Sequence, residues 1–255
     1  MYRLERTKDS YRAQPWMLPY EERIGVLKAA RASCRRTAAF LYPHFDSSTF
    51  RYRAYNPAQT LTYSFWWSGS YFVKDDLQKL WKDLRFIDVL VVIRCGWTDG
   101  LESFLKAAKS KGIRLCYDVD DLIYHPKHMP SVIEALGLSN ETELDFWFGQ
   151  TERNCMIAKL CDSMITTNQC LAQHLREDFD KPCDVVQNYL NWTQEKVSKE
   201  YFDAKCVQEP EMPFVIGYFS GSPTHEKDLL VALPQLEQFL LENADAQLTI
   251  VGYME

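Results

Sequence analysis

The sequence lacks several features that would assign a site at once. Its eight cysteines are scattered without a CxxC pair or a zinc-binding spacing, and we interpret them as reduced side chains packed as small hydrophobes. A glycine-rich nucleotide-binding fingerprint is also missing. The net charge is -6, with acidic and basic residues mixed along the chain. Because no basic stripe is present, we expect no nucleic-acid partner.

Long apolar segments are missing as well. The first 14 residues are charged and lack the apolar core of a signal peptide, and no run of about 18 apolar residues is present to span a bilayer. We therefore expect a cytoplasmic protein, and peripheral contact with the inner face of a membrane stays open. Core-forming residues are abundant: 46% of the 255 residues are apolar, which is enough for one large domain or two ordinary ones.

Apolar runs and helical periodicity alternate along most of the chain. A parallel sheet buried on both faces needs strands of this apolar kind, joined by helices, so the pattern predicts an α/β fold with Rossmann-like sheets. The expected strands are residues 37–44, 87–94, 113–117, 162–167 and 183–186, and the expected helices are residues 20–33, 75–84, 99–110, 142–160 and 168–179.

The pattern restarts after a polar, lysine-rich segment at residues 191–211, which we interpret as a linker or hinge. A strand at 214–218, a helix at 228–242 and a strand at 248–252 form a second βαβ unit. We expect an N-terminal extension at 1–36, a Rossmann-like domain with the hinge at 37–210, and a partial second domain at 211–255. One βαβ unit is marginal alone, so we expect the chain to be part of a longer parent.

Three carboxylates follow the expected strand 113–117 within four residues: Asp118, Asp120 and Asp121. Ligands of open α/β sheets bind outside the carboxyl ends of the strands. Carboxylates held together there repel one another, which can raise the pKa of one of them and allow it to exchange protons. The alternative is that they cap a helix or pair with a neighbouring arginine.

A basic segment follows the first confident strand. Ser47 or Ser48 can cap a helix that carries Arg51 and Arg53 in its first turn, which would make an anion site at a helix N-terminus. The alternative is that the two arginines pair with carboxylates such as Asp46.

Further candidates lie at other strand ends and in an aromatic segment. His44 and Arg94 each end an expected strand, and we assign both to the acceptor side of a site together with Arg51 and Arg53. The aromatic segment at residues 62–74 is of the kind that stacks on sugars, although packing is the simpler interpretation. The basic end of helix 20–33 (Arg31, Arg35 and Arg36) suits a helix C-terminus or a membrane-surface patch.

Three stretches, STFRYRAYN, GIRLCYDVDDLIY and IGYFSGSPTHEKDL, occur in this order and together resemble GT-B glycosyltransferases of group 1 (GT4-like), in particular bacterial enzymes of surface-polysaccharide assembly. The resemblance covers roughly residues 37–255. It implies two Rossmann-like domains, of which the first binds a glycan or lipid-linked acceptor and the second binds a UDP-, GDP- or dTDP-sugar. It also implies no metal or other cofactor, and it favours retention at the anomeric carbon.

The resemblance assigns roles to individual residues. Asp120 stands where relatives often have a histidine that lines the sugar cleft, so it becomes the candidate base, supported by Asp118 and Asp121. The family's pair of donor-binding glutamates would lie beyond Glu255, so we expect the chain as given to be unable to turn over a sugar nucleotide. The residues matching the donor-diphosphate loop are Ser220, Gly221, Ser222, Thr224, His225 and Lys227.

Two other functions stay open. Asp118 and Asp120 also fit an aspartate–variable–aspartate phosphotransferase, in which the first carboxylate attacks phosphorus and Mg²⁺ is required. Alternatively, the chain is a non-catalytic module that binds a glycan or a partner through Trp66, Trp67 and Tyr71.

Overall fold

The computed structural model describes residues 14–46, 48–206, 214–220 and 226–252. The chain divides into two compact units, Met1–Gln194 and Glu195–Glu255. Each unit contains a parallel β-sheet whose strands are connected through helices. The predicted α/β class with Rossmann-like sheets is therefore confirmed.

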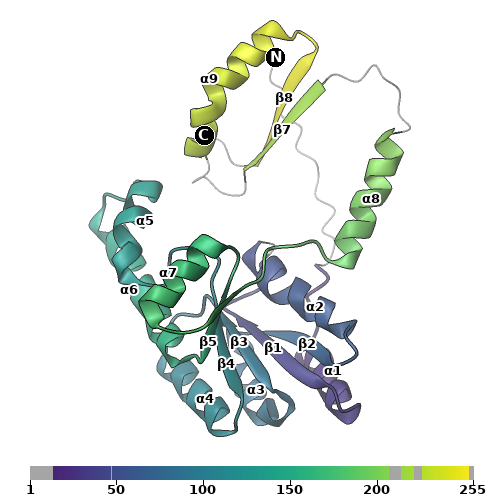
Figure 1. Cartoon of the computed structure of the whole chain (residues 1–255), viewed down its shortest axis with the longest axis vertical. Coiled ribbons are helices and arrows are strands. Elements are labelled where there is room, and N and C mark those ends of the chain that lie inside the picture. Colours follow the sequence, from purple (N-terminus) through teal and green to yellow (C-terminus); the bar gives the residue numbers. More distant parts are fainter. Residues whose placement is uncertain (1–13, 47, 207–213, 221–225, 253–255) are drawn as a thin grey trace. The chain divides into compact units, whose positions relative to one another are not determined.

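The first unit is built on a six-stranded sheet in which every strand pairing is parallel (Figure 1). The strand order is β2-β1-β3-β4-β5-β6. Because the strands run in one direction, their carboxyl ends form one edge of the sheet and their amino ends form the opposite edge. The strands are β1 (Arg36–Tyr42), β2 (Trp67–Val73), β3 (Val89–Ile93), β4 (Arg114–Asp118), β5 (Ser163–Thr166) and β6 (Cys183–Val185).

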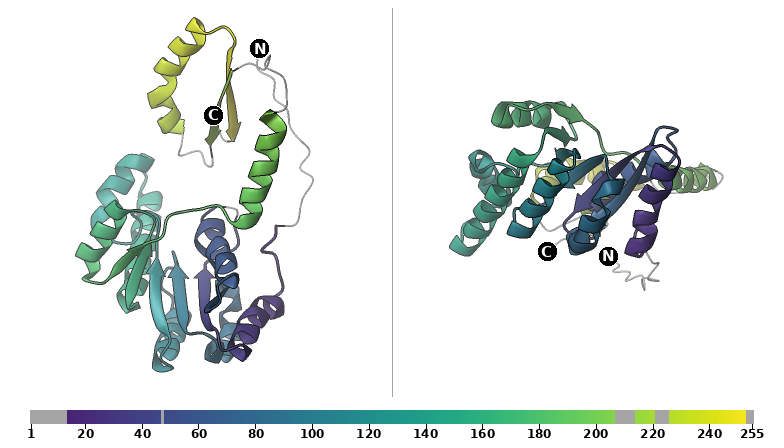
Figure 2. Two further views of the ribbon diagram at one scale, coloured as in Figure 1. Left: turned by 45° about the vertical axis from the view of Figure 1, so that its right-hand side comes forward. Right: turned by 90° about the horizontal axis from the view of Figure 1, so that it is seen from below.

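Helices cover the sheet. In the view from below, α1 (Tyr20–Ala32), α3 (Leu77–Asp83) and α4 (Asp99–Ser110) lie along one side of it (Figure 2). The π-helical turn η1 (Arg51–Tyr55) and α2 (Asn56–Thr62) contribute to a separate core on the other face. The remaining helices of this unit are α5 (Met129–Leu136), α6 (Glu141–Leu160) and α7 (Gln169–Phe179), with 3-10 turns at Lys74–Asp76, Leu84–Phe86 and Pro126–His128.

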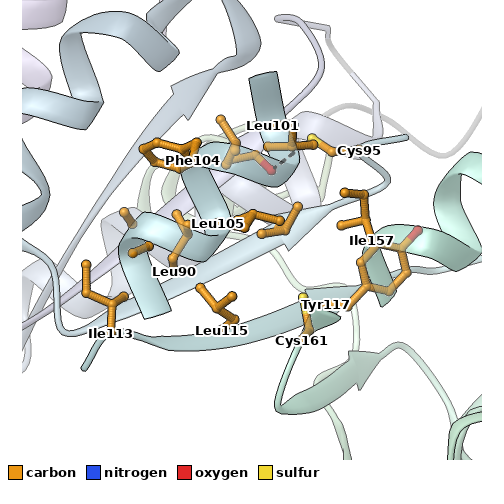
Figure 3. Close-up of a cluster of buried hydrophobic side chains, with 14 of the residues drawn as sticks. Leu90, Cys95, Leu101, Phe104, Leu105, Ile113, Leu115, Tyr117, Ile157 and Cys161 are labelled. Atoms are coloured by element: carbon orange, nitrogen blue, oxygen red, sulfur yellow. Dashed lines mark hydrogen bonds between the residues drawn. The ribbon is translucent and has the colours of Figure 1, made fainter. Parts of the chain in front are cut away.

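The larger core lies between the sheet and α4 (Figure 3). Leu101, Phe104 and Leu105 share one face of this helix and pack toward Leu90 of β3 and Leu115 of β4, and all five are almost fully buried. Side chains alternate between the two faces along each strand, so neighbouring residues of β3 enter different cores. This alternation explains why the central strands are apolar throughout.

The aromatic segment after α2 forms a strand, β2, that the sequence did not predict. Tyr71 and Phe72 are buried on opposite faces of the sheet, so the segment is part of the core. Gly69 allows α2 to approach this strand, because a Cβ atom there would lie 2.9 Å from the Cα of Ala58. A residue larger than glycine at position 69 would therefore push α2 away from β2.

The predicted N-terminal helix exists as α1, but it is not part of an extension. Tyr20, Ile24 and Leu27 are buried in the same core as β1 and α4. Arg23 forms a buried pair with Asp76 at 2.6 Å, which ties α1 to the end of β2. The helix therefore belongs to the first unit, which differs from the expected boundary at residue 36.

The second unit contains β7 (Phe214–Ser220), α9 (Glu226–Glu242) and β8 (Ala246–Gly252), as the restarted pattern predicted. Its two strands pair in parallel. The segment expected as a linker contains a helix, α8 (Trp192–Cys206), and the division between units falls after Gln194 and not near residue 210. Among the described helices, none is long and apolar enough to cross a bilayer.

Candidate functional site

The strand order creates a topological switch point between β1 and β3. The chain leaves β1 to form β2 on one side of it and later forms β3 on the other side. The connections after β1 and β3 pass over opposite faces of the sheet, and open α/β sheets bind ligands at such a point. His44 and Arg94 lie in these two connections, and Asp118 ends the next strand, β4. Residues from three predicted strand ends therefore share one edge.

In the connection after β1, the side chain of Asp46 binds backbone amides at the start of the next helical segment. Its Oδ1 accepts hydrogen bonds from the backbone amides of Ser48, at 2.9 Å, and Phe50, at 3.0 Å. Ser48 was predicted as a possible cap, but its hydroxyl instead contacts Asp46 at 3.2 Å, and residue 47 lies outside the described residues. Asp46 therefore starts the helical segment that carries Arg51 and Arg53, and it is not their ion-pair partner.

Arg53 and Asp118 form a bidentate ion pair beneath this edge. Arg53 Nε donates to Asp118 Oδ1 at 2.9 Å, and Arg53 Nη2 donates to Asp118 Oδ2 at 2.6 Å. The two side chains are 2% and 4% exposed. The pair joins the STFRYRAYN and YDVDD stretches, which lie 65 positions apart. The sequence predicted that Arg53 binds an anionic ligand, but in the structure Arg53 pairs with Asp118 of the same chain.

Burial raises the pKa of Asp118 to about 6, while the charge and hydrogen bonds of Arg53 act in the opposite direction. Both carboxylate oxygens are occupied by Arg53, so neither is directed at a ligand. The position of Asp118 matches the alternative of pairing with an arginine, and its support role beside Asp120 stays a prediction.

Arg53 also holds the segment that follows β6. Its Nη1 donates to the carbonyl oxygen of Val186 at 2.6 Å and to Oδ1 of Asn188 at 3.3 Å. The guanidinium therefore links three segments at the carboxyl edge: η1, the end of β4 and the residues after β6. No signal in the sequence singled out Val186 or Asn188 as members of the site. The contact to Val186 uses its backbone carbonyl, which leaves no pattern in the sequence, and Asn188 is a lone polar residue after a strand.

An amide network extends this attachment toward the end of the first unit. Asn191 Nδ2 donates to Asn56 Oδ1 at 3.0 Å and to Gln59 Oε1 at 2.9 Å. Asn56 in turn donates to the carbonyl of Tyr189 and to Gln194, each at 2.9 Å. Both asparagines are buried. The residues after β6 are therefore fixed to α2, although the sequence suggested that a linker begins there.

Arg94 and Asp120 form a second pair that is closer to solvent. Arg94 Nε donates to Asp120 Oδ1 at 2.5 Å, and Arg94 Nη2 lies 3.6 Å from Asp121 Oδ2. The side chain of Asp120 is 13% exposed, and Asp121 is largely exposed. The second oxygen of Asp120 has no hydrogen bond from the described residues, whereas both oxygens of Asp118 accept hydrogen bonds from Arg53.

The backbone supports this second pair. Arg94 has a φ of 47°, in the left-handed region that non-glycine residues seldom adopt. Its amide donates to the carbonyl of Asp118 at 3.1 Å, which joins the ends of β3 and β4. A strained backbone is often found where a side chain must be aimed, and here the strained residue is the one that holds Asp120.

The other two acceptor-side candidates lie apart from the carboxylates. Arg51 stacks on Trp16, with its guanidinium carbon 5.1 Å from the ring centroid, and contacts the smaller core. His44 is exposed, with its ring 6.0 Å from that of Tyr42 at the end of β1. The structure therefore brings Arg53 and Arg94 to the carboxylates and leaves Arg51 out of the site.

The three aromatic residues offered for stacking on a sugar do not line this edge. Tyr71 is buried in the core, and Trp67 begins β2 at the amino edge of the sheet. Trp66 directly precedes it and is exposed there. The opposite edge carries Asp120, so these aromatics and the carboxylates do not form one sugar site.

In the second unit, Ser220 ends β7 and is buried. Its register partner is Gly252, whose φ is 114° and where a Cβ atom would lie 1.9 Å from the Ser220 carbonyl oxygen. Only glycine fits at this approach. Lys227 lies in the first turn of α9. The predicted ligands Gly221, Ser222, Thr224 and His225 lie outside the described residues.

Metal-dependent phosphotransfer finds little support in the geometry of the first unit. Within the described part of the chain, no group of three or more histidine, cysteine or acidic side chains is placed to hold a metal ion. The attacking carboxylate of such a mechanism would be Asp118, and both of its oxygens face Arg53 in a buried pair. A phosphoryl group would have to displace that arginine first.

No protein-family model matches this chain, and no curated protein matches it. Two solved structures are similar to it. One is UGT2 of Phytolacca americana complexed with UDP-2fluoro-glucose and pterostilbene, at 9% identity and a TM-score of 0.49, over 86% of this chain and 72% of that one. The other is a UDP-glucosyltransferase from Polygonum tinctorium capable of glucosylating indoxyl, in complex with 3,4-dichloroaniline, at 11% identity and a TM-score of 0.40, over 86% and 71%.

Proposed function

We propose that the protein is a GT-B-type glycosyltransferase that moves a sugar from a nucleotide-sugar to a hydroxyl of a glycan or lipid-linked acceptor. The observation that carries the proposal is the Arg94–Asp120 pair beside the switch point, in which one carboxylate oxygen is held at 2.5 Å and the other is free of protein partners among the described residues. The resemblance of the three ordered stretches supports the same reaction.

Asp120 takes the proton of the acceptor hydroxyl in this proposal. A positioned carboxylate within hydrogen-bond reach of the attacking oxygen can accept its proton as the bond to the anomeric carbon forms. Arg94 fixes the orientation of the carboxylate through Oδ1 and leaves Oδ2 for the acceptor. Asp118 supports this pair: its carbonyl oxygen accepts a hydrogen bond from the amide of Arg94, and its carboxylate is held by Arg53.

The leaving nucleoside diphosphate is assigned to the second unit. Negative charge develops on it as the glycosidic bond breaks, so nearby cations and amides stabilise the transition state. The connection from β7 to α9 joins a strand end to the N-terminus of a 17-residue helix, where the helix dipole favours an anion. Ser220, Gly221, Ser222, Thr224, His225 and Lys227 are the residues we assign to this role.

The test is nucleoside diphosphate release from UDP-, GDP- and dTDP-sugars in the presence of saccharide acceptors, together with donor binding by calorimetry. It is made on a longer protein that contains this chain together with the donor-binding glutamates that the resemblance implies, because the chain as given is not expected to turn over a sugar nucleotide. We expect one donor to support release. Asp120→Asn should reduce the rate by about 10²–10⁴-fold, the usual contribution of a general base, while the donor Kd stays the same. Asp145→Asn is the matched control, because Asp145 is an exposed carboxylate on α6.

Two results would count against the proposal. If that longer protein binds no donor and releases no diphosphate, sugar transfer is the wrong reaction. If Asp120→Asn retains the same rate as Asp145→Asn, transfer occurs without Asp120 and the base lies elsewhere.

A further inference from the structure

Two segments that the proposed function does not use lie side by side at the amino edge of the first unit's sheet. One is the basic end of α1 with the start of β1, and the other is the aromatic turn before β2. Arg36 is the register partner of Trp67, its amide donates to the carbonyl of Trp66 at 2.9 Å, and its guanidinium lies 5.7 Å from the Trp67 ring centroid. We call residues 63–66 with Arg35 and Arg36 the aromatic–basic turn.

The aromatic side chains of this turn are exposed to an unusual degree. Phe65 is 89% exposed and Trp66 is 79% exposed, and Tyr63 beside them is also exposed, with its ring 5.8 Å from that of Trp192. Moving a large aromatic side chain out of water lowers the free energy. Several such side chains exposed on one turn therefore indicate a surface that binds a partner or a membrane.

Hydrogen bonds hold the turn in this conformation. Arg35 Nη1 donates to the carbonyl oxygens of Thr62, Ser64 and Trp67 at 3.2–3.4 Å. Ser64 Oγ accepts from the amides of Trp66 and Trp67, each at 3.2 Å. The aromatic rings are therefore presented by a fixed backbone and do not fold back onto the sheet.

The charge beside the aromatics is positive. Within the described part of the chain, no carboxylate pairs with Arg35 or Arg36, whereas Arg31 one turn earlier pairs with Asp88 at 2.8 Å. Two arginines without an acidic partner thus flank the two most exposed aromatics. Tryptophan and arginine at one site suit the boundary of an anionic bilayer, where the ring enters the headgroup layer and the cation meets lipid phosphate.

We propose that the aromatic–basic turn is a membrane-contact site that inserts Phe65 and Trp66 into the interface of an anionic bilayer. The proposal does not depend on sugar transfer, and it differs from a membrane-lying helix, because the apolar face of α1 is packed in the core. Two exposed rings beside Arg35 and Arg36 suit an anionic bilayer, and a protein partner for the turn is an outcome of the test.

The test is co-sedimentation of the 255-residue chain with vesicles of phosphatidylcholine that contain about 30% phosphatidylglycerol, beside vesicles of phosphatidylcholine alone. We expect binding to the anionic vesicles that weakens in salt above about 0.1 M. Phe65→Ser/Trp66→Ser should weaken it at least tenfold. Arg36→Gln should weaken it severalfold and reduce its dependence on salt.

The matched control is Phe146→Ser/Phe148→Ser. These are also exposed aromatics, but they lie on α6 beside the acidic residues Glu143 and Asp145, so they should not bind an anionic surface. Thermal denaturation of both double variants shows whether each is folded. The proposal is overturned if the wild-type chain does not bind anionic vesicles, or if the folded Phe65/Trp66 and Phe146/Phe148 variants bind them equally. A protein partner for the turn would give the first of these results.

Discussion

Replacing Arg53 by methionine is expected to destabilise the first unit by an amount that depends on pH. Methionine fills much of the same space, but it leaves Asp118 buried without its cation. Breaking a buried ion pair in this way costs about 3–5 kcal/mol when the remaining group stays charged. Burial already raises the pKa of Asp118 to about 6 against the opposing effect of Arg53, so removing Arg53 raises this pKa further.

The direction of the pH dependence follows from that rise. The pKa of Asp118 in the folded variant lies above its unfolded value of about 3.9, so the folded state binds this proton more tightly. The contribution to stability is fully present below the unfolded value and is lost as the pH rises through the folded value. Between the unfolded and the folded pKa, the free energy of unfolding falls by about 1.4 kcal/mol per pH unit. The variant should therefore be closer to wild type at pH 5 than at pH 8.

Urea denaturation followed by tryptophan fluorescence at pH 5 and pH 8 measures this difference. Lys106→Met is the control, because Lys106 is an exposed cation 2.7 Å from Glu102 and its loss should change the stability little at either pH. Arg53→Met/Asp118→Asn removes the titrating group and should lose the added pH dependence. Equal destabilisation of Arg53→Met at both pH values, or a loss below about 1 kcal/mol at pH 8, would refute the reasoning.

Two further substitutions test a close backbone contact and a hydrogen-bonded carboxylate elsewhere in the first unit. Gly69→Ala should destabilise the first unit by about 1–3 kcal/mol, because its Cβ would lie 2.9 Å from the backbone of Ala58, and a lowered Tm measures this; an unchanged Tm would show that α2 can move away from β2 at little cost. Asp178→Asn tests how the stability of the first unit depends on pH in the acidic range. Burial acts to raise the pKa of Asp178, but hydrogen bonds from Lys127 and His128 hold it below its usual value. Its contribution is then present above the unfolded pKa and lost as the pH falls through the folded one, so the variant should differ most from wild type near pH 7 and least near pH 3 in thermal denaturation. A difference independent of pH would contradict that assignment.

The sequence determined most of the fold. The β-branched residues at 87–94 and the alternation at 113–117 predicted β3 and β4, because a strand buried on both faces must be apolar along its length. The helical spacing of Leu101, Phe104 and Leu105 predicted α4 for the same reason of burial. The position of three carboxylates after a strand predicted that they lie at the carboxyl edge of the sheet, and they do.

Some elements could not be predicted from the sequence, because their residues are determined by contacts with distant parts of the chain. The aromatic segment 62–74 contains β2, but Gly69 and Ser70 interrupt the apolar pattern that is typical of a strand. Gly69 is needed where α2 approaches the strand, and the Ser70 hydroxyl donates a hydrogen bond to the carbonyl of Arg23 in α1. The polar segment after residue 191 forms α8, and its first residues are fixed by Asn56. Composition alone gives both segments the character of a loop.

The residue types that reach the carboxyl edge could be predicted from the sequence, but the partner of each side chain depends on the fold. Asp118 and Asp120 are two positions apart and chemically alike. The fold gives Asp118 to Arg53 in a buried pair and leaves Asp120 with one oxygen on Arg94 and the other without a hydrogen bond from the described residues. Their difference depends on partners 65 and 26 positions away, and only the packing of strands and helices brings such partners within hydrogen-bond distance.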